Sequence, residues 1–332
     1  MRLIPQIQTP GMANVPRRWW AEIKRRSTSP GDRVFYAVAL LCGLSFVGLL
    51  VAMAVYLFQS AWPAILRFGW GFITGTRWDP VRDVFGALPA IYGTLLTSAI
   101  AMLIAVPVSL AVGIFLAELA PRWLRAPASF LVEMLAAIPS VVIGLWGMFI
   151  MVPVIRDPLQ TWLGDSLGFL PLFQGPPFGV GFLAGGLILA IMALPIITAV
   201  IRDSILTVPN SQREAMLALG ATRWETISKA VVPYARSGII AASILGLGRA
   251  LGETMAVTMV IGNAYKITSS LFSPGNTISS KIANEFNEAS GELWIGSLIE
   301  LGLILFAITL VVNVIGRLVV RFMVAGPKGG VR

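Results

Sequence analysis

The chain has 332 residues, of which 56% are hydrophobic and only 12% are charged. Soluble domains carry about 25% charged residues, so this composition excludes an ordinary soluble domain and predicts an integral membrane protein. The chain has a net charge of +9, no histidine and a single cysteine, Cys42, which excludes histidine-based catalysis, intrachain disulfides and Cys/His metal centres.

Six apolar stretches are long enough to cross a bilayer, whose hydrocarbon core requires about 20 apolar residues in a helix. The first stretch is longer than the apolar core of a signal peptide, about 7 to 15 residues, so we interpret it as a retained membrane anchor. The sequence therefore predicts an all-α membrane protein with six transmembrane helices. They are expected at residues 34–58, 92–119, 130–155, 181–201, 238–261 and 294–320.

Basic residues are distributed unevenly around these stretches. The N-terminal tail has seven, the loops after the second and fourth stretches have two and five, and the C-terminal end has four, against six in the remaining loops. Lys and Arg accumulate on the cytoplasmic side, so both termini are expected there, and the net charge follows from topology without nucleic-acid binding. The predicted organisation is a basic tail (1–33), the first transmembrane helix (34–58), an outer loop (59–91), a five-helix core (92–320) with a long loop at 202–236, and a second tail (321–332).

Aromatic and basic residues lie side by side in the N-terminal tail, at residues 17–26. This mixture favours a segment that lies on an anionic lipid surface. A basic tail that only sets the topology fits the same residues equally well.

The long loop at 202–236 has the pattern of two short helices. Gly220 fits a left-handed residue that ends the first helix, and Thr222 followed by Glu225 fits a capping box that begins the second. Pro233 is expected to end the second helix before Ser237. The loop is either an ordinary amphipathic connector or a helical hairpin with a function at the membrane face.

Two ionisable residues, Arg249 and Glu253, lie in the middle of the fifth apolar stretch. A charged residue at the bilayer centre costs about 2.5 to 3.5 kcal/mol on insertion scales, so such residues mark transport pathways or buried pairs. Four residues apart on one helix, they are expected to face the same side. Arg202, at the end of the fourth stretch, is a further candidate for contact with an anion.

The chain lacks a loop that would hold nucleotide phosphates. Such a P-loop requires Gly-Lys followed by Ser or Thr. If transport is driven by ATP, another subunit must therefore bind the nucleotide. The residues that precede the five lysines are Ile23, Ser228, Tyr265, Ser280 and Pro327.

Glu214, Ala215, Gly220 and Pro233 resemble, in type and spacing, the cytoplasmic EAA loop of permease subunits of bacterial ABC importers. The pattern departs from the family at Met216, where a second alanine is usual. In that family the loop forms a coupling helix that docks on the ATPase subunit. The resemblance implies that Glu214, Ala215 and Gly220 carry this role here.

The fifth apolar stretch and the loop after it narrow the resemblance. Residues 246–257, 261–263, 273–278 and 282–286 resemble the C-type permease subunits of the high-affinity phosphate importer, the Pst system. The similarity extends over about residues 90–320.

This resemblance implies the type I ABC importer permease fold in a bacterial plasma (inner) membrane. It further implies a heterodimer with an A-type permease subunit, two cytoplasmic ATPase subunits that bind ATP and Mg, and an extracytoplasmic phosphate-binding protein. The chain itself is expected to be a transport subunit without enzymatic activity, cofactor or metal. Inorganic phosphate would move by alternating access along a pathway that includes Arg249, Glu253 and Arg202.

Other functions remain compatible with the same residues. Another oxyanion, such as sulfate or molybdate, presents the same charge to an arginine. A gradient-driven anion carrier would need an ion site and often has inverted repeats, and neither is recognisable in the sequence. A structural scaffold would tolerate changes at Glu214 and Gly220, and the two charges in the fifth stretch would then be only a structural ion pair.

Overall fold

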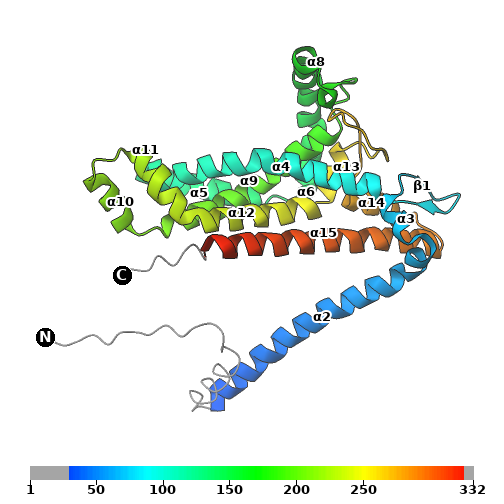
Figure 1. Ribbon diagram of the computed structural model, residues 1–332, viewed down its shortest axis with the longest axis horizontal. Coiled ribbons are helices and arrows are strands. Elements are labelled where there is room, and N and C mark those ends of the chain that lie inside the picture. The colour runs from blue at the N-terminus through cyan, green and yellow to red at the C-terminus, as the bar shows by residue number, and fades with distance from the viewer. Residues whose placement is uncertain (1–29, 325–332) are drawn as a thin grey trace. The chain divides into compact units, whose positions relative to one another are not determined.

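The computed structural model describes residues 30–324, with side chains described for 30–321. Most of the two predicted tails lies outside these residues. The chain divides into two compact units, Met1–Gln59 and Ser60–Arg332. Within the described range six helices are long and apolar enough to cross a membrane, so the predicted all-α protein with six transmembrane helices is confirmed (Figure 1).

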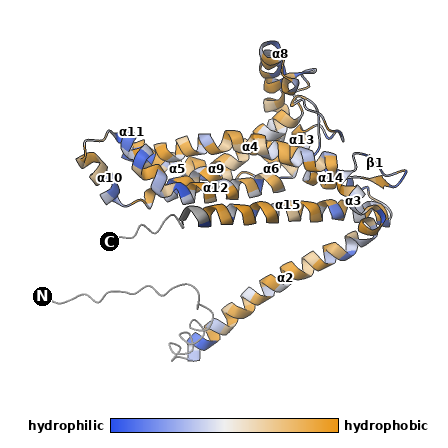
Figure 2. Ribbon diagram, viewed as in Figure 1, coloured by the Kyte–Doolittle hydropathy of each residue, from blue (hydrophilic) through white to orange (hydrophobic). Residues whose placement is uncertain are grey.

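The first described helix, α2 (Pro30–Phe68), is apolar along most of its length (Figure 2). In the first unit its large side chains are exposed, including Phe35 at 77% and Leu49 at 69%. A continuous apolar surface of this kind is unfavourable in water and is solvated by lipid in a bilayer. The helix therefore has the character expected of a membrane anchor.

The second unit is built around α9, the most buried of the six membrane-length helices. Helices α4 and α12 both pack against α9, and α15 packs against α12 (Figure 1). The main hydrophobic core lies along α9 and includes Ile188, Ile197 and Ile201, none of which is accessible to solvent. The four helices are α4 (Leu88–Ile114), α9 (Phe182–Leu206), α12 (Val232–Gly252) and α15 (Glu292–Val324).

Glycine makes the close approach to α9 possible. A Cβ atom on Gly113 of α4 would lie only 2.7 Å from Cγ2 of Ile201, and one on Gly246 of α12 only 2.4 Å from Cδ1 of Ile197. Ser109 of α4 also donates a hydrogen bond to the carbonyl oxygen of Leu194 in α9, at 3.2 Å. Because lipid tails are as apolar as the helices, association in a membrane depends on such close packing and on interhelical hydrogen bonds.

The third membrane-length helix differs from the expected stretch 130–155. Pro139 separates an amphipathic helix from the span, which begins at Ser140 and continues to Leu167. Proline disfavours helical backbone at the residue that precedes it. The apolar stretch therefore contained a helix boundary that its hydropathy did not reveal. The elements are α5 (Arg122–Ala136), α6 (Ser140–Trp146), η3 (Gly147–Met151), α7 (Val152–Val154), η4 (Ile155–Gln160) and α8 (Thr161–Leu167).

Short elements cover the end of the second unit that carries α14 (Figure 1). Two of them, β1 and β2, pair antiparallel, with Trp78 opposite Phe85. A second hydrophobic core here includes Phe72, Phe85 and Leu298. The elements at this end are α3 (Trp70–Thr74), β1 (Trp78–Asp79), β2 (Val84–Phe85) and α14 (Ile278–Glu285). Two other short elements are α13 (Met255–Val260), which contacts α14 and α6, and η5 (Pro171–Phe173), which packs beside α8.

Lys281 of α14 lies in an aromatic cage at this end. Its ammonium lies 4.9 Å from the ring centroid of Trp78 and 4.5 Å from that of Tyr265. It also forms an ion pair with Glu285, whose carboxylate accepts hydrogen bonds from the indole N–H of Trp78 at 2.6 Å and of Trp294 at 3.2 Å. Burial lowers the pKa of Lys281, and the Glu285 carboxylate opposes this effect. The pair fastens β1, α14 and the start of α15 together.

Replacing Lys281 with methionine should lower the free energy of unfolding by about 3 to 5 kcal/mol, because it leaves the largely buried Glu285 carboxylate uncompensated. Equilibrium unfolding in detergent micelles measures this change. The matched control is Arg82→Met, which removes a 79% exposed partner of Asp79 and should cost less than about 1 kcal/mol. Equal losses of unfolding free energy in the two variants would contradict a stabilising role for the Lys281–Glu285 pair.

Candidate coupling loop and substrate pathway

Helix α10 (Asn210–Ala218) has one inward and one outward face. Arg213 and Met216, three residues apart, are half-buried, whereas Glu214, Ala215 and Leu217 are exposed. Residues three apart lie on one side of a helix, so Arg213 and Met216 form the inward face. Glu214 and Ala215, between them in the sequence, point outward. Both residues are therefore accessible to a partner.

Gly220 has a φ of +82°, which confirms the predicted left-handed residue after α10. A Cβ atom built at Gly220 would have no neighbour within 4 Å. Glycine is therefore required for backbone conformation and not for close approach at this position.

Helix α11 (Arg223–Thr226) begins with the predicted capping box. The backbone N–H of Thr222 donates to Oε2 of Glu225 at 2.9 Å, and the backbone N–H of Glu225 donates to Oγ1 of Thr222 at 3.3 Å. The prediction that Pro233 ends this helix is wrong, because Arg223–Gly252 is one continuous membrane-length helix. A π turn, η6 (Ile227–Val231), ends two residues before the proline. Prolines and π turns commonly mark such local interruptions of the α-helical hydrogen-bond ladder.

Arg213 anchors α10 to the membrane helices, a role that the sequence analysis missed. Its NH2 atom donates to Oε1 of Glu118 at 2.6 Å, and its Nε atom donates to the same oxygen at 3.1 Å. The guanidinium also donates to the carbonyl oxygens of Val208 at 2.5 Å and Ile205 at 3.1 Å. Glu118 lies in η2 (Phe115–Leu119), 95 residues before Arg213, so spacing in the sequence does not reveal the pair.

Large apolar side chains are exposed beside α10. The exposed fractions are 51% for Leu217, 83% for Leu219 and 67% for Trp224. Adjacent exposed apolar residues of this kind mark a site of contact with protein or membrane.

The expectation that Arg249 and Glu253 share one face of a helix is wrong. Helix α12 ends at Gly252, Glu253 has extended backbone (φ −70°, ψ 129°), and α13 begins at Met255. Glycine destabilises helices, and Gly252 lies directly before the break. The fifth predicted stretch, 238–261, therefore contains an interruption at its two candidate residues.

The break separates the two charges. No ion pair between Arg249 and Glu253 occurs among the described residues. The buried Nε atom of Arg249 has no hydrogen-bond partner. Glu253 has other partners. Its Oε1 accepts a hydrogen bond from the backbone N–H of Ala256 at 3.5 Å, and its backbone carbonyl oxygen accepts one from the hydroxyl of Ser279 at 2.9 Å. Arg249 thus presents an unsatisfied donor in a membrane-length helix.

Arg202 near the end of α9 is already occupied by carboxylates. It donates to Oδ1 of Asp203 at 2.8 Å and to Oε1 of Glu133 in α5 at 3.0 Å, and only 15% of its side chain is exposed. An anion at Arg202 would have to displace these carboxylates or add to them.

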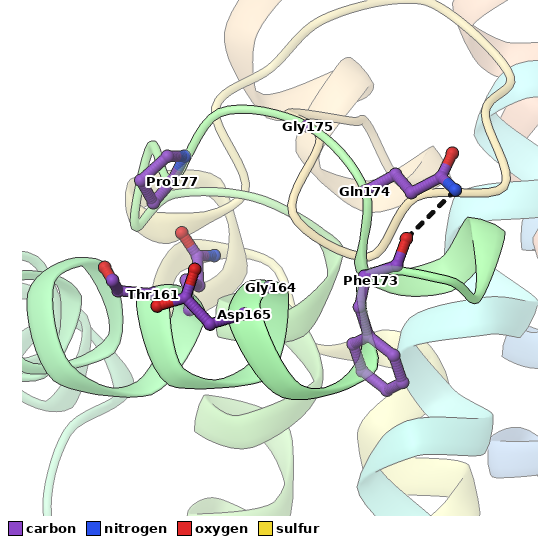
Figure 3. A pocket seen from close by; sticks show the side chains of 9 residues that line it. Thr161, Gly164, Asp165, Phe173, Gln174, Gly175 and Pro177 are labelled. Atoms are coloured by element: carbon purple, nitrogen blue, oxygen red, sulfur yellow. Dashed lines mark hydrogen bonds between the residues drawn. The ribbon is translucent and has the colours of Figure 1, made fainter.

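A hollow of about 370 Å³ lies between α8 and the loop that follows it (Figure 3). Thr161 and Asp165 line it from α8, and the loop passes over them at Gly175 and Pro177. Gln160 at its edge accepts a hydrogen bond from the backbone N–H of Gly179 at 2.9 Å. None of the residues predicted for the substrate pathway lines this hollow.

Six membrane-length helices and a protruding helical loop held by an ion pair define a multi-pass membrane protein. Residues 109–325 match the binding-protein-dependent transport system inner membrane component family, and the chain belongs to this family. The predicted localisation in the inner membrane is thereby confirmed, as is a role as transport component and not as enzyme.

Related proteins give a finer comparison. The chain is 49% identical to the phosphate transport system permease protein PstC of Haemophilus influenzae, covering 86% of this chain and 91% of the relative. It is 48% identical to the PstC protein of Mesorhizobium japonicum (86% and 89% covered). It is 42% identical to the probable PstC protein of Methanocaldococcus jannaschii (81% and 87% covered). The resemblance inferred from the fifth stretch is confirmed.

Solved structures support the fold. One chain of a bacterial ABC transporter involved in alginate import matches with a TM-score of 0.56 and 19% identity, covering 90% of this chain and 98% of that chain. A chain of the inward-facing MetNI methionine ABC transporter matches with a TM-score of 0.53 and 18% identity, covering 74% and 99%. The predicted importer permease fold is confirmed.

Replacing Gly220 with valine should open the α10–α11 loop about 5-fold to 30-fold more often, because a left-handed residue with a side chain costs about 1 to 2 kcal/mol. Limited trypsin digestion at Arg213 and Arg223 measures the opening. Gly220→Asn is the matched control, since asparagine tolerates this conformation and should digest nearly as slowly as the original chain. Equal digestion of the valine and asparagine variants would show that φ does not constrain the loop.

Proposed function

We propose that this chain is the permease subunit of an ATP-driven importer that moves inorganic phosphate into the cytoplasm. The proposal is carried by its similarity, over most of its length, to phosphate transport permeases. The buried, unpartnered Nε of Arg249 at a helix break adds a chemical reason.

Phosphate is a strongly hydrated oxyanion, so a pathway through protein must replace the water that it loses. A planar guanidinium can donate two parallel hydrogen bonds to phosphate oxygens. An uncompensated charge in a membrane-length helix is costly, and an arriving anion would relieve that cost. We assign Arg249 this contact.

Glu253 belongs to the same proposed pathway. Its backbone forms the break after α12, and interrupted helices at membrane depth occur where backbone is buried in protein or lines a cavity. The Glu253 carboxylate would repel an anion that is not close to a cation. Phosphate attracted by Arg249 would therefore pass Glu253 without remaining bound there. Arg202 would act near the inner end, where phosphate exchanges with the carboxylates of Asp203 and Glu133.

The end of the second unit that carries α10 is proposed to face the cytoplasm, with both termini on the same side. The concentration of basic residues in the loops at this end supports this orientation. Two ATPase subunits that bind ATP and Mg would dock there on Glu214, Ala215 and the Gly220 turn. Pro233, which lies inside the continuous helix Arg223–Gly252, would carry the movement of this loop into the span.

The remaining partners are inferred from the same role. An A-type permease subunit would complete a heterodimer, and an extracytoplasmic phosphate-binding protein would deliver the ion to the opposite face. One matched transporter structure is described as a complex with a periplasmic protein bound to an alginate pentasaccharide, which supports this kind of assembly by fold. Membrane lipid would surround the exposed apolar helices, including α2.

Alternating access connects these parts. ATP binding would draw the ATPase subunits together and displace α10, and the spans would then open to the loaded binding protein. Hydrolysis would return the pathway to the inward-open state. Exposed Glu214 and Ala215 provide the contact surface that this cycle requires.

Replacing Arg249 with lysine should reduce phosphate uptake at least about 10-fold while the complex assembles normally, because lysine keeps the charge and loses the planar fork. Uptake of radiolabelled phosphate by cells that lack the gene and carry each variant measures this effect. Arg156→Lys is the matched control, since Arg156 is half-exposed and pairs only with neighbouring Asp157 among the described contacts. Normal uptake by the Arg249→Lys variant would contradict phosphate contact by the fork.

The same assay tests the substrate. Sulfate and molybdate are added as competitors, because tetrahedral oxyanions present similar edges to an arginine. Uptake restored by the original chain and blocked by neither competitor supports phosphate, whereas competition by either would favour another oxyanion. Uptake that persists after ATP depletion with the ion gradients intact would indicate a gradient-driven carrier.

A further inference from the structure

The guanidinium of Arg213 joins three segments of the chain. It belongs to the first half of α10 and forms an ion pair with Glu118 in η2. It also donates to the carbonyl oxygen of Ile205 in the last turn of α9 and to that of Val208 just after this helix. Only 19% of the Arg213 side chain and 15% of the Glu118 side chain are exposed. Solvent therefore screens this contact much less than an ordinary surface ion pair.

The geometry of the contact is directional. Two nitrogens of the guanidinium, Nε and NH2, contact the Glu118 carboxylate, and NH1 and NH2 reach the carbonyl oxygens. The last carbonyl groups of a helix lack partners within it and carry partial negative charge, which favours a cation at the end of α9. A lysine could supply the charge but not this set of donors.

Arg213 has no counterpart on the rest of α10. Among the described residues, it is the only side chain of α10 with a hydrogen bond or ion pair to α9 or η2. The neighbouring Glu214 and Ala215 are exposed on the other face of the helix. Helix α10 therefore has one face that a partner can reach. Arg213, the residue before Glu214, provides its polar attachment to the spans.

We propose that Arg213 and Glu118 are the positioning link that transmits movement of α10 to the spans; this inference rests on the proposed importer function. Arg213 touches neither substrate nor nucleotide in this proposal. It acts by keeping α10 in register with the inner ends of α4 and α9.

Beyond Arg213, a continuous series of close contacts leads toward the proposed phosphate contact. Gly113 of α4 packs on Ile201 of α9, and Gly246 of α12 packs on Ile197 of the same helix. Arg249 lies one turn beyond Gly246 on α12. Spatial continuity alone does not establish energetic coupling, so the proposal requires a direct measurement of coupling.

The test reconstitutes the full importer, with its ATPase subunits and phosphate-loaded binding protein, in proteoliposomes. The measured quantity is phosphate transported per ATP hydrolysed, which is independent of the amount of complex that assembles. The variants are Arg213→Lys, Glu118→Gln and the double variant. Lys229→Ala is the control, because it removes an exposed ion pair with Glu225 within one helix of the same loop.

Each single variant should hydrolyse ATP but transport at least about fivefold less phosphate per ATP than the original complex. The double variant should be no worse than the poorer single variant, because residues that act as one pair are not additive. Lys229→Ala should keep the original ratio. A purely structural pair would lower the yield of complex and leave the ratio unchanged.

Three outcomes would overturn the inference. They are an unchanged ratio in both single variants, multiplied losses in the double variant, and failure of all variants to assemble, which would make the pair a folding element. Failure of the proposed function is distinguishable, since the original complex itself would then hydrolyse ATP without moving phosphate.

Discussion

Close packing of helices around α9 is the constraint on which the rest of this permease depends. In a bilayer, lipid solvates an isolated apolar helix as well as a neighbouring helix does, so exclusion of water does not hold the bundle together. Glycines and short polar side chains at the contacts supply the attraction instead, through close approach and through hydrogen bonds such as that of Ser109. The helices around α9 are consequently placed by shape.

The two arginines proposed to act in transport lie where this packing ends. Arg249 is found just before the break that terminates α12, and Arg213 is found just beyond the end of α9. Arg213 donates to backbone carbonyl oxygens that regular helix no longer satisfies. The difference between them is the counterion: Glu118 is present beside Arg213, whereas the Nε atom of Arg249 lacks a partner. This difference is the reason for proposing that one arginine holds structure and the other receives an anion.

The sequence predicted features that depend on a few neighbouring residues. Apolar length revealed six spans, and local chemistry revealed the left-handed Gly220 and the capping box of Thr222. Features that depend on backbone breaks or on distant residues escaped it. Hydropathy stayed high across Pro139 and across Gly252, although the helix is interrupted at both, and the partner of Arg213 is 95 residues away. A prediction from periodicity assumes an unbroken helix, and these helices are broken.

The π turns give these helices an unusual relation between sequence length and shape. A π turn contains one residue more than the α turn that would join the same neighbours, and each extra residue rotates the next part of the helix by about 100°. Two such turns, η3 and η4, lie between α6 and α8. The face that α8 presents is therefore displaced by roughly 200° from the one that an uninterrupted helix would present. Loss of one residue within η3 or η4 would convert it to an α turn while α8 keeps the side that it now presents, so this span can change its length by single residues without turning α8.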